Sequence, residues 1–378
     1  MVICIEVEQR TKSELDQLLK VGGYKDYSQV VAIAISNQVL LQRQVAATGN
    51  SLVVAGGDAS PQDKGNFQPR LDEASAKQDT SEATATSIPA IFLLPTQKLT
   101  NCEAAPLPND VFVPGHDVPV DRWIFGQHNK ILPVKASCRA LAALCRDARG
   151  IPLKAAADIA AQAAKLGDYL RQTDTSHLVS RDEALSLAFP STGSEAGDKA
   201  RLRFANQFVA SANKQGQLSG LPVDLKLVNY ISAKESRLSL TAAGWQFAAM
   251  PNPILDRSAG DAVAKFSDAE IDFLVSHIRD NVPVEDSAYR AVIRALNKGA
   301  NTPETLDDYL TQFVPNRTDK PFTRAFLTTQ RSGVISRMSD LGMLTRRREG
   351  IKVTYVTTER AMEYFSTSSH ATAGVSND

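Results

Sequence analysis

Residues 337–359, RMSDLGMLTRRREGIKVTYVTTE, place three consecutive arginines directly behind a run with helical spacing. On a helical wheel the apolar residues of this run share one side: Val334, Ile335, Met338 and Leu341. The arginines then lead into Glu349-Gly350 and the alternating segment IKVTYVT, which together predict a β-hairpin. The stretch therefore predicts a helix, an arginine-rich hairpin and a closing helix in TERAMEYF.

The positive charge of this stretch is local, because the whole chain carries no net charge. The 378 residues contain 42 Lys and Arg against 42 Asp and Glu, which excludes a uniformly basic protein such as a histone. Between Asn316 and Lys352, however, nine basic residues stand against three acidic ones. Such an excess can neutralise several phosphates with release of counterions, so it predicts contact with a polyanion.

The composition, 43% hydrophobic and 22% charged, is that of a globular protein with several domains. No stretch approaches the roughly 18 consecutive apolar residues of a membrane span, and Met1 leads straight into a charged segment. We therefore expect a cytoplasmic protein without a membrane span or secretory signal. Cys4, Cys102, Cys138 and Cys145 show no CxxC pair, so we expect reduced thiols.

One pattern occurs twice in the C-terminal two thirds. Each copy has a short helix closed by proline, a loop, a longer helix, a hairpin and a closing helix. Pro190 lies 28 residues before Leu218, and Pro315 lies 29 residues before Leu344. This near-equality pairs Leu218 with Leu344 and predicts a duplicated unit.

The two copies, residues 134–250 and 266–366, resemble the winged helix-turn-helix family of DNA-binding domains. In the second copy GVISRMSDLGML resembles the recognition helix, and VTYVTTERA resembles the last hairpin strand with its helix cap. In the first copy LSLTAAG likewise resembles the last hairpin strand with its helix cap. The resemblance implies two domains that contact duplex DNA.

The wheel and the hairpin give the candidate contacts to DNA. In the second copy Ser332, Gly333, Ser336 and Asp340 are expected to face outward, with Arg337 at the flank. The candidate DNA-binding residues there are Arg331, Ser332, Ser336, Arg337, Arg346, Arg347, Arg348 and Lys352. The first copy has a thinner patch, seven basic against three acidic residues from Asp198 to Arg237. Its candidates are Arg203, Asn206 and Lys214, with Phe204 and Phe208 facing inward.

Residues 1–46 predict a strand and two helices. Ile3, Ile5 and Val7 alternate with polar residues, and Val31 and Ile35 lie on one face of the second helix. With ELDQLL, GGY and YSQVVAIAI, this order resembles the ribbon-helix-helix family of Met-repressor and Arc-type regulators, which implies a homodimer through these five residues. The opposite strand face carries Glu6 and Glu8, and carboxylates facing phosphate favour dimerisation over DNA recognition.

The remaining segments connect these units. Residues 47–90 are rich in small and polar residues, which predicts a flexible linker. Residues 91–133 are irregular, and we expect Phe112, Trp123 and Phe125 to pack onto the domain that follows. Residues 367–378 are expected to be a disordered tail.

No pattern for catalysis is found, and we expect neither an enzyme nor a cofactor. The chain lacks a phosphate-binding glycine loop, GxSxG and HExxH. His116, Asp117, Asp121 and His128 could ligate a metal, but their spacing fits no common site, so ordinary loop polarity is favoured and no metal is expected. Trp245 and Phe247 are expected in the core.

The sequence thus predicts a mainly α protein with small β-hairpins (α+β), comprising a ribbon-helix-helix module and two winged-helix domains. The expected function is that of a dimeric, sequence-specific double-stranded DNA-binding protein, a transcriptional regulator. Two alternatives stay open: a plasmid-type replication initiator or partition factor, and a non-catalytic adaptor subunit that binds protein partners in a larger defence or DNA-processing complex.

Overall fold

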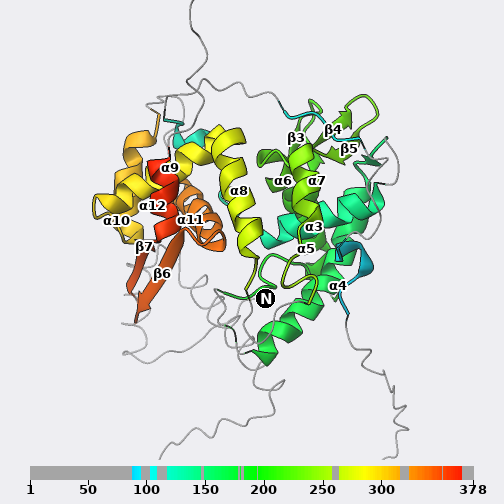
Figure 1. Ribbon diagram of the computed structural model, residues 1–378, viewed down its shortest axis with the longest axis horizontal. Coiled ribbons are helices and arrows are strands. Elements are labelled where there is room, and N and C mark those ends of the chain that lie inside the picture. Colours follow the sequence, from blue (N-terminus) through cyan, green and yellow to red (C-terminus); the bar gives the residue numbers. More distant parts are fainter. Residues whose placement is uncertain are drawn as a thin grey trace, which may run out of the picture. The chain divides into compact units, whose positions relative to one another are not determined.

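The computed structural model describes residues 87–94, 103–108, 117–145, 149–177, 179, 183–193, 195–257, 264–315, 323–350 and 352–367, all within the unit Thr80–Asp378. Helices predominate in this part, beside small sheets, so the predicted class is confirmed (Figure 1). The expected N-terminal module, with its dimer contacts Ile3, Ile5, Val7, Val31 and Ile35, lies outside the described residues. The same holds for the expected linker up to residue 86 and for the tail from residue 368.

Residues 268–366 form what we call the second subdomain. Its elements are α8 (Asp268–Asn281), α9 (Pro283–Asn297), α10 (Pro303–Leu310), η4 (Thr311–Phe313), α11 (Arg324–Asp340), β6 (Leu344–Glu349), β7 (Lys352–Thr357) and α12 (Glu359–Ser366). Ser267 and Glu270 form a capping box at α8, and Thr302, Thr323 and Thr358 cap α10, α11 and α12 by accepting backbone N–H bonds. Local sequence therefore sets where these helices begin.

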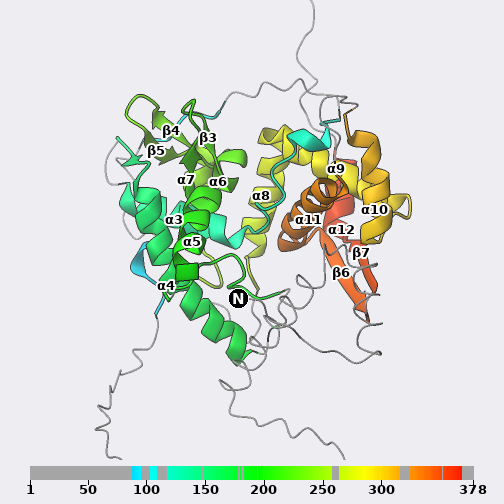
Figure 2. The same cartoon turned by 180° about the vertical axis from the view of Figure 1, so that it is seen from behind.

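The hairpin follows α11 closely. β6 and β7 pair antiparallel from Leu344 opposite Thr357 to Glu349 opposite Lys352, and Gly350 has a positive φ of 60° in the turn. In both views the hairpin extends beyond the helices of its subdomain (Figures 1 and 2). The chain between α9 and α10 also joins it, because the Tyr355 N–H donates to the Asn301 carbonyl at 2.8 Å.

Residues 132–249 form the first subdomain. Its elements are α3 (Leu132–Leu144), β1 (Ile151–Pro152), α4 (Ala155–Ser176), α5 (Glu195–Phe204), the π-helical turn η3 (Ala205–Val209), β2 (Ser211–Ala212), β3 (Leu218–Ser219), α6 (Leu221–Asp224), β4 (Val228–Ser232), β5 (Arg237–Leu240) and α7 (Ala242–Ala249). β4 and β5 form a hairpin, and β1 pairs with β5 on its other edge. β1 thus adds a third segment to this hairpin. Asn301 does the same in the second subdomain, and both segments lie between two helices.

A shared set of backbone hydrogen bonds relates the two subdomains. After α6, the Leu227 N–H donates to the Pro222 carbonyl and Lys226 has a φ of 55°. After α11, the Met343 N–H donates to the Met338 carbonyl and Gly342 has a φ of 65°. Each residue of the second set lies 116 positions after its counterpart (342 minus 226). Both helices therefore end in the same left-handed cap before a hairpin.

The closing helices repeat the match. Thr241 donates its hydroxyl to the Lys226 carbonyl and caps α7, while Thr358 donates to the Gly342 carbonyl and caps α12, both at 2.8 Å. Because these bonds link distant residues in the same way, the described part contains one structural pattern twice.

The pairing of Leu218 with Leu344 is wrong, because the shared bonds pair Val228 with Leu344. The long helix expected around Phe204 and Phe208 ends at η3, and Ala210 is extended with a φ of −170°. The β2–β3 hairpin follows before α6 resumes the helix. Asn213 stabilises its turn, since its side-chain oxygen accepts from the N–H groups of Gln215 and Gln217.

The expectation that residues 91–133 pack onto the domain that follows is correct only in part. Arg139 donates to the Phe92 carbonyl and Asn229 to the Pro106 carbonyl, both donors lying within the first subdomain, whereas the region around Trp123 contacts the second subdomain. Trp123 is buried, and Gln330 of α11 donates to its carbonyl at 3.3 Å. Phe125 is 42% exposed, and Phe112 lies outside the described residues. The amide oxygen of Gln330 also accepts from the Gly126 N–H.

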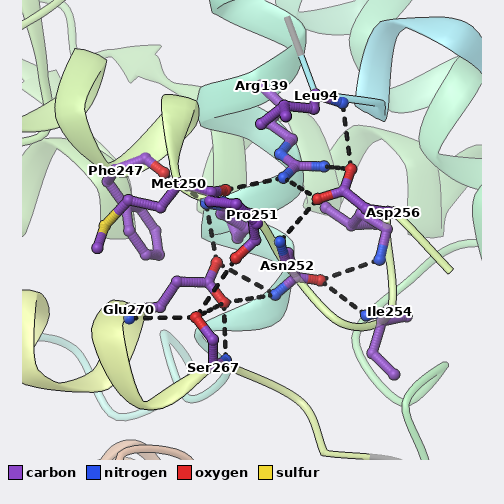
Figure 3. Close-up of polar contacts among 12 residues, drawn as sticks. Leu94, Arg139, Phe247, Met250, Pro251, Asn252, Ile254, Asp256, Ser267 and Glu270 are labelled. Atoms are coloured by element: carbon purple, nitrogen blue, oxygen red, sulfur yellow. Dashed lines mark hydrogen bonds and ion pairs between the residues drawn. The ribbon is translucent and has the colours of Figure 1, made fainter. Parts of the chain in front are cut away.

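Charge pairs join α3 of the first subdomain to α8 of the second and to the chain that connects them (Figure 3). Lys135 on α3 and Glu270 on α8 pair at 2.8 Å with both side chains fully buried, and burial lowers the pKa of Lys135 to about 8. Arg139 on α3 donates to both carboxylate oxygens of Asp256, at 2.6 and 2.7 Å. The Asn252 amide donates to Glu270 as well. Removing any one charge would leave its partner uncompensated in the interior.

Candidate nucleic-acid interface

From residue 332 to residue 339, the exposed side of α11 consists of small hydroxyl side chains. Ser332 and Ser339 are exposed and Ser336 is half-buried, and their spacing of four and three residues keeps them on one face. Ser332 and Ser336 thus occupy the outward positions expected for them. Ser339, which continues the same face, was not among the candidates.

The outward placement of Gly333 and Asp340 is wrong. A Cβ on Gly333 would overlap the backbone of Gly126, so the two glycines let the chain pass directly against α11. Asp340 is buried, accepts from the Ile131 N–H at 3.0 Å and pairs with Lys265 at 3.1 Å. The segment 117–131 therefore covers the side of α11 beside the serine face.

Arg337 is fully buried and does not reach the surface. Its guanidinium donates to both carboxylate oxygens of Glu285 on α9, at 2.6 and 2.9 Å, and to the His128 carbonyl. Its fixed donors are thus used inside the protein. The expectation that Arg337 contacts DNA is wrong.

Arg331 is also excluded as a DNA contact. It is buried, pairs with Asp307 of α10 at 2.6 Å and donates to the Tyr355 hydroxyl at 3.2 Å. It therefore joins α10, α11 and β7. The two arginines stabilise the subdomain that carries the candidate interface instead of forming part of it.

The three consecutive arginines lie on β6 with exposed side chains, as does Lys352 on β7. Successive residues of a strand point to opposite faces, so Arg346 and Arg348 share the face of Leu344 while Arg347 points to the other. Arg346 and Arg348 therefore lie on the side of the hairpin that faces α11.

A groove of about 830 Å³ lies along α11 and β6. Its lining includes Lys130, Glu183, Lys265, Ser332, Ile335, Ser336, Ser339, Asp340, Leu344, Thr345, Arg346, Arg348 and Tyr355. Lys130 and Lys265 were missed by the sequence analysis, because both lie far from α11 along the chain. The groove therefore brings the serine face of α11 together with Arg346 and Arg348, as the sequence predicted for the helix and the hairpin.

A second groove, of about 700 Å³, lies between α11 and the first subdomain. Arg203 of α5, exposed as expected, lines it together with Gln207 of η3, which was not a candidate. Asn206 and Lys214 are exposed too, but neither lines this groove, and Lys214 lies in the β2–β3 turn. Phe204 and Phe208 are buried, as expected.

The other polar candidates form separate contacts. His128 bonds to Asp224 at 2.9 Å, and Asp117 pairs with Arg294 at 2.5 Å. His116 lies outside the described residues, within which no group of three potential metal ligands occurs. Cys138 is free and buried, and burial raises its pKa to about 12. Among the helices of the described ranges, none combines the length and apolar character needed to cross a membrane.

Comparisons of the chain with protein-family models, with curated proteins and with solved structures found no match.

Proposed function

We propose that the chain binds double-stranded DNA through α11 and the β6–β7 hairpin of the second subdomain, which we assign to the winged-helix class. The observation that carries the proposal is the groove in which exposed Arg346 and Arg348 flank a helix face of Ser332, Ser336 and Ser339. Small side chains allow a helix to approach a duplex closely, while arginines beside it bind phosphates. The Asn301–Tyr355 bond supports the class, because it adds a third segment to the hairpin.

The hairpin arginines differ from the arginines of α11 in their exposure to solvent. Arg331 and Arg337 are held in buried ion pairs, whereas Arg346, Arg347 and Arg348 are all exposed. From Arg346 to Lys352 the hairpin carries four basic residues and one acidic residue, Glu349. Such a strand supplies a positive field that strengthens phosphate contact at low salt.

A salt titration tests this proposal. The variant R346A/R347A/R348A should bind a duplex more weakly, with a slope against log[salt] reduced by about 0.9 for each phosphate that the variant no longer neutralises. The matched control K154A/K165A/K298A removes three exposed positive charges that line neither groove. Its slope should equal that of the unchanged protein. Equal slopes for all three proteins, or no binding by the unchanged protein, would refute the proposal.

As a cellular role we propose transcriptional regulation, with the chain acting as a homodimer through residues 1–46. Selecting the genomic fragments that the protein binds separates this role from the alternatives. Single sites in promoters support a regulator. Arrays of repeated sites at an origin support a replication initiator, and the absence of enriched sites supports the adaptor.

A further inference from the structure

The two grooves are continuous, because both are lined by Lys130 and Ser332. One runs along α11 and the hairpin of the second subdomain. The other passes between α11 and the α5–η3 region of the first subdomain, where Arg203 and Gln207 lie. A ligand that follows the serine face of α11 toward Thr328 and Thr329 therefore meets the first subdomain.

The segment 126–131 between the subdomains is held from both sides. On one side, α11 bonds to it through Gln330, Arg337 and Asp340. On the other, Asp224 at the end of α6 bonds to His128 at 2.9 Å. Lys130 lies within this segment and is half-buried, so its position is fixed relative to both subdomains.

The charges along the joined grooves have one predominant sign. Lys130 and Arg203 are the charged residues that line the groove between the subdomains, without a carboxylate among its lining residues. The groove along α11 adds Lys265, Arg346 and Arg348 as cations, with Glu183 and Asp340 as acids. Asp340 is paired with Lys265, so these two charges offset each other. The remaining charged lining residues are Lys130, Arg203, Arg346 and Arg348 against Glu183, so positive charge still predominates.

The hairpin of the first subdomain lines neither groove. Its Arg237 donates to the carbonyls of Arg149 and Gly150, so this guanidinium is occupied within the protein. The first subdomain therefore presents positive charge to the grooves from α5 and not from its hairpin.

We infer that one duplex lies along both grooves and is held by the two subdomains of a single chain together, with Arg203 as the phosphate contact of the first. This inference rests on the function proposed above. From Thr328 to Asp340 the helix face is about 18 Å long at 1.5 Å per residue, which corresponds to about five base pairs at 3.4 Å each. A short duplex is therefore long enough to reach both subdomains.

The test uses the full chain and a duplex of about 12 base pairs, titrated at several salt concentrations. R203A should weaken binding about threefold to tenfold and lower the salt slope by about 1, as the removal of one phosphate contact requires. R203E should weaken binding further, and R203K should restore most of it. K234A is the matched control, because Lys234 is exposed in the same subdomain and lies outside both grooves. Unchanged thermal unfolding of each variant shows that the fold is intact.

Two outcomes separate this inference from the proposed function. If R203A and R203E bind like the unchanged protein while R346A/R348A loses affinity, the shared duplex is refuted and binding by the second subdomain stands. If none of these variants changes the affinity, both proposals fail. Binding that does not depend on salt would also overturn the inference, and it would point to a protein segment against the apolar wall around Leu187 and Phe189.

Discussion

Replacing Arg337 by methionine should destabilise the protein strongly, because the change leaves Glu285 as an unpaired charge in the interior. Both side chains are fully buried and are joined by two bonds of 2.6 and 2.9 Å. Breaking a buried pair by removing one partner costs about 3–5 kcal/mol. The His128 carbonyl loses a donor as well, which adds about 1–3 kcal/mol if water does not replace it.

Urea unfolding with linear extrapolation measures this loss. R347M is the matched control, since Arg347 is exposed on β6, and its free energy of unfolding should change by about 0.5 kcal/mol or less. The double variant R337M/E285L should recover most of the loss, because two apolar side chains can replace a buried ion pair at little cost.

The result that refutes this reasoning is an R337M protein that unfolds at the same urea concentration as R347M. DNA binding gives a second, independent measurement. At a temperature where R337M is folded, its salt slope should equal that of the unchanged protein. A slope lower by about 1 with unchanged stability would instead make Arg337 a phosphate contact.

Two further predictions concern the contacts between the subdomains. G126A should cost about 1–3 kcal/mol of stability, because the added Cβ overlaps the Thr329 carbonyl, whereas G193A adds a methyl group to open space and should be neutral by the same urea assay. His277 is buried, and burial lowers its pKa below the ordinary 6.5, so the folded state favours the neutral ring. Stability should therefore fall as the pH drops below about 6.5, where the unfolded chain takes up the proton. H277Q, which can still donate to the Leu225 carbonyl, should lose less stability between pH 7 and pH 5, and an equal loss would contradict the role of His277.

The sequence was most informative where structure depends on near neighbours. Apolar spacing identified α11, and the arginine-rich strand, the Glu349-Gly350 turn and Thr358 identified the hairpin and closing helix. The β2–β3 hairpin was missed although Asn213 and Gly216 are turn residues, because the surrounding alanines and amides suit a helix equally well.

Whether a polar residue of α11 is buried or exposed depends on partners that are distant in the sequence. Arg337 is 52 residues from Glu285 and 209 from His128, and Gln330 lies more than 200 residues from Gly126. A helical wheel assigns such residues to solvent because it does not include the segment that covers them. Lys130 and Lys265 were missed for the same reason, since only folding brings them beside the serine face.

Two histidines bond to neighbouring residues at the C-terminal end of α6. His128 bonds to the Asp224 side chain, and His277 bonds to the Leu225 carbonyl at 2.9 Å. Together with the buried pair of Lys135 on α3 and Glu270 on α8, these bonds oppose a change in the separation of the two subdomains. A duplex that touches both halves must therefore supply the adaptation itself, by bending or by changing its groove width. Selectivity would then depend partly on how easily a given base sequence deforms, even at positions that no side chain reaches.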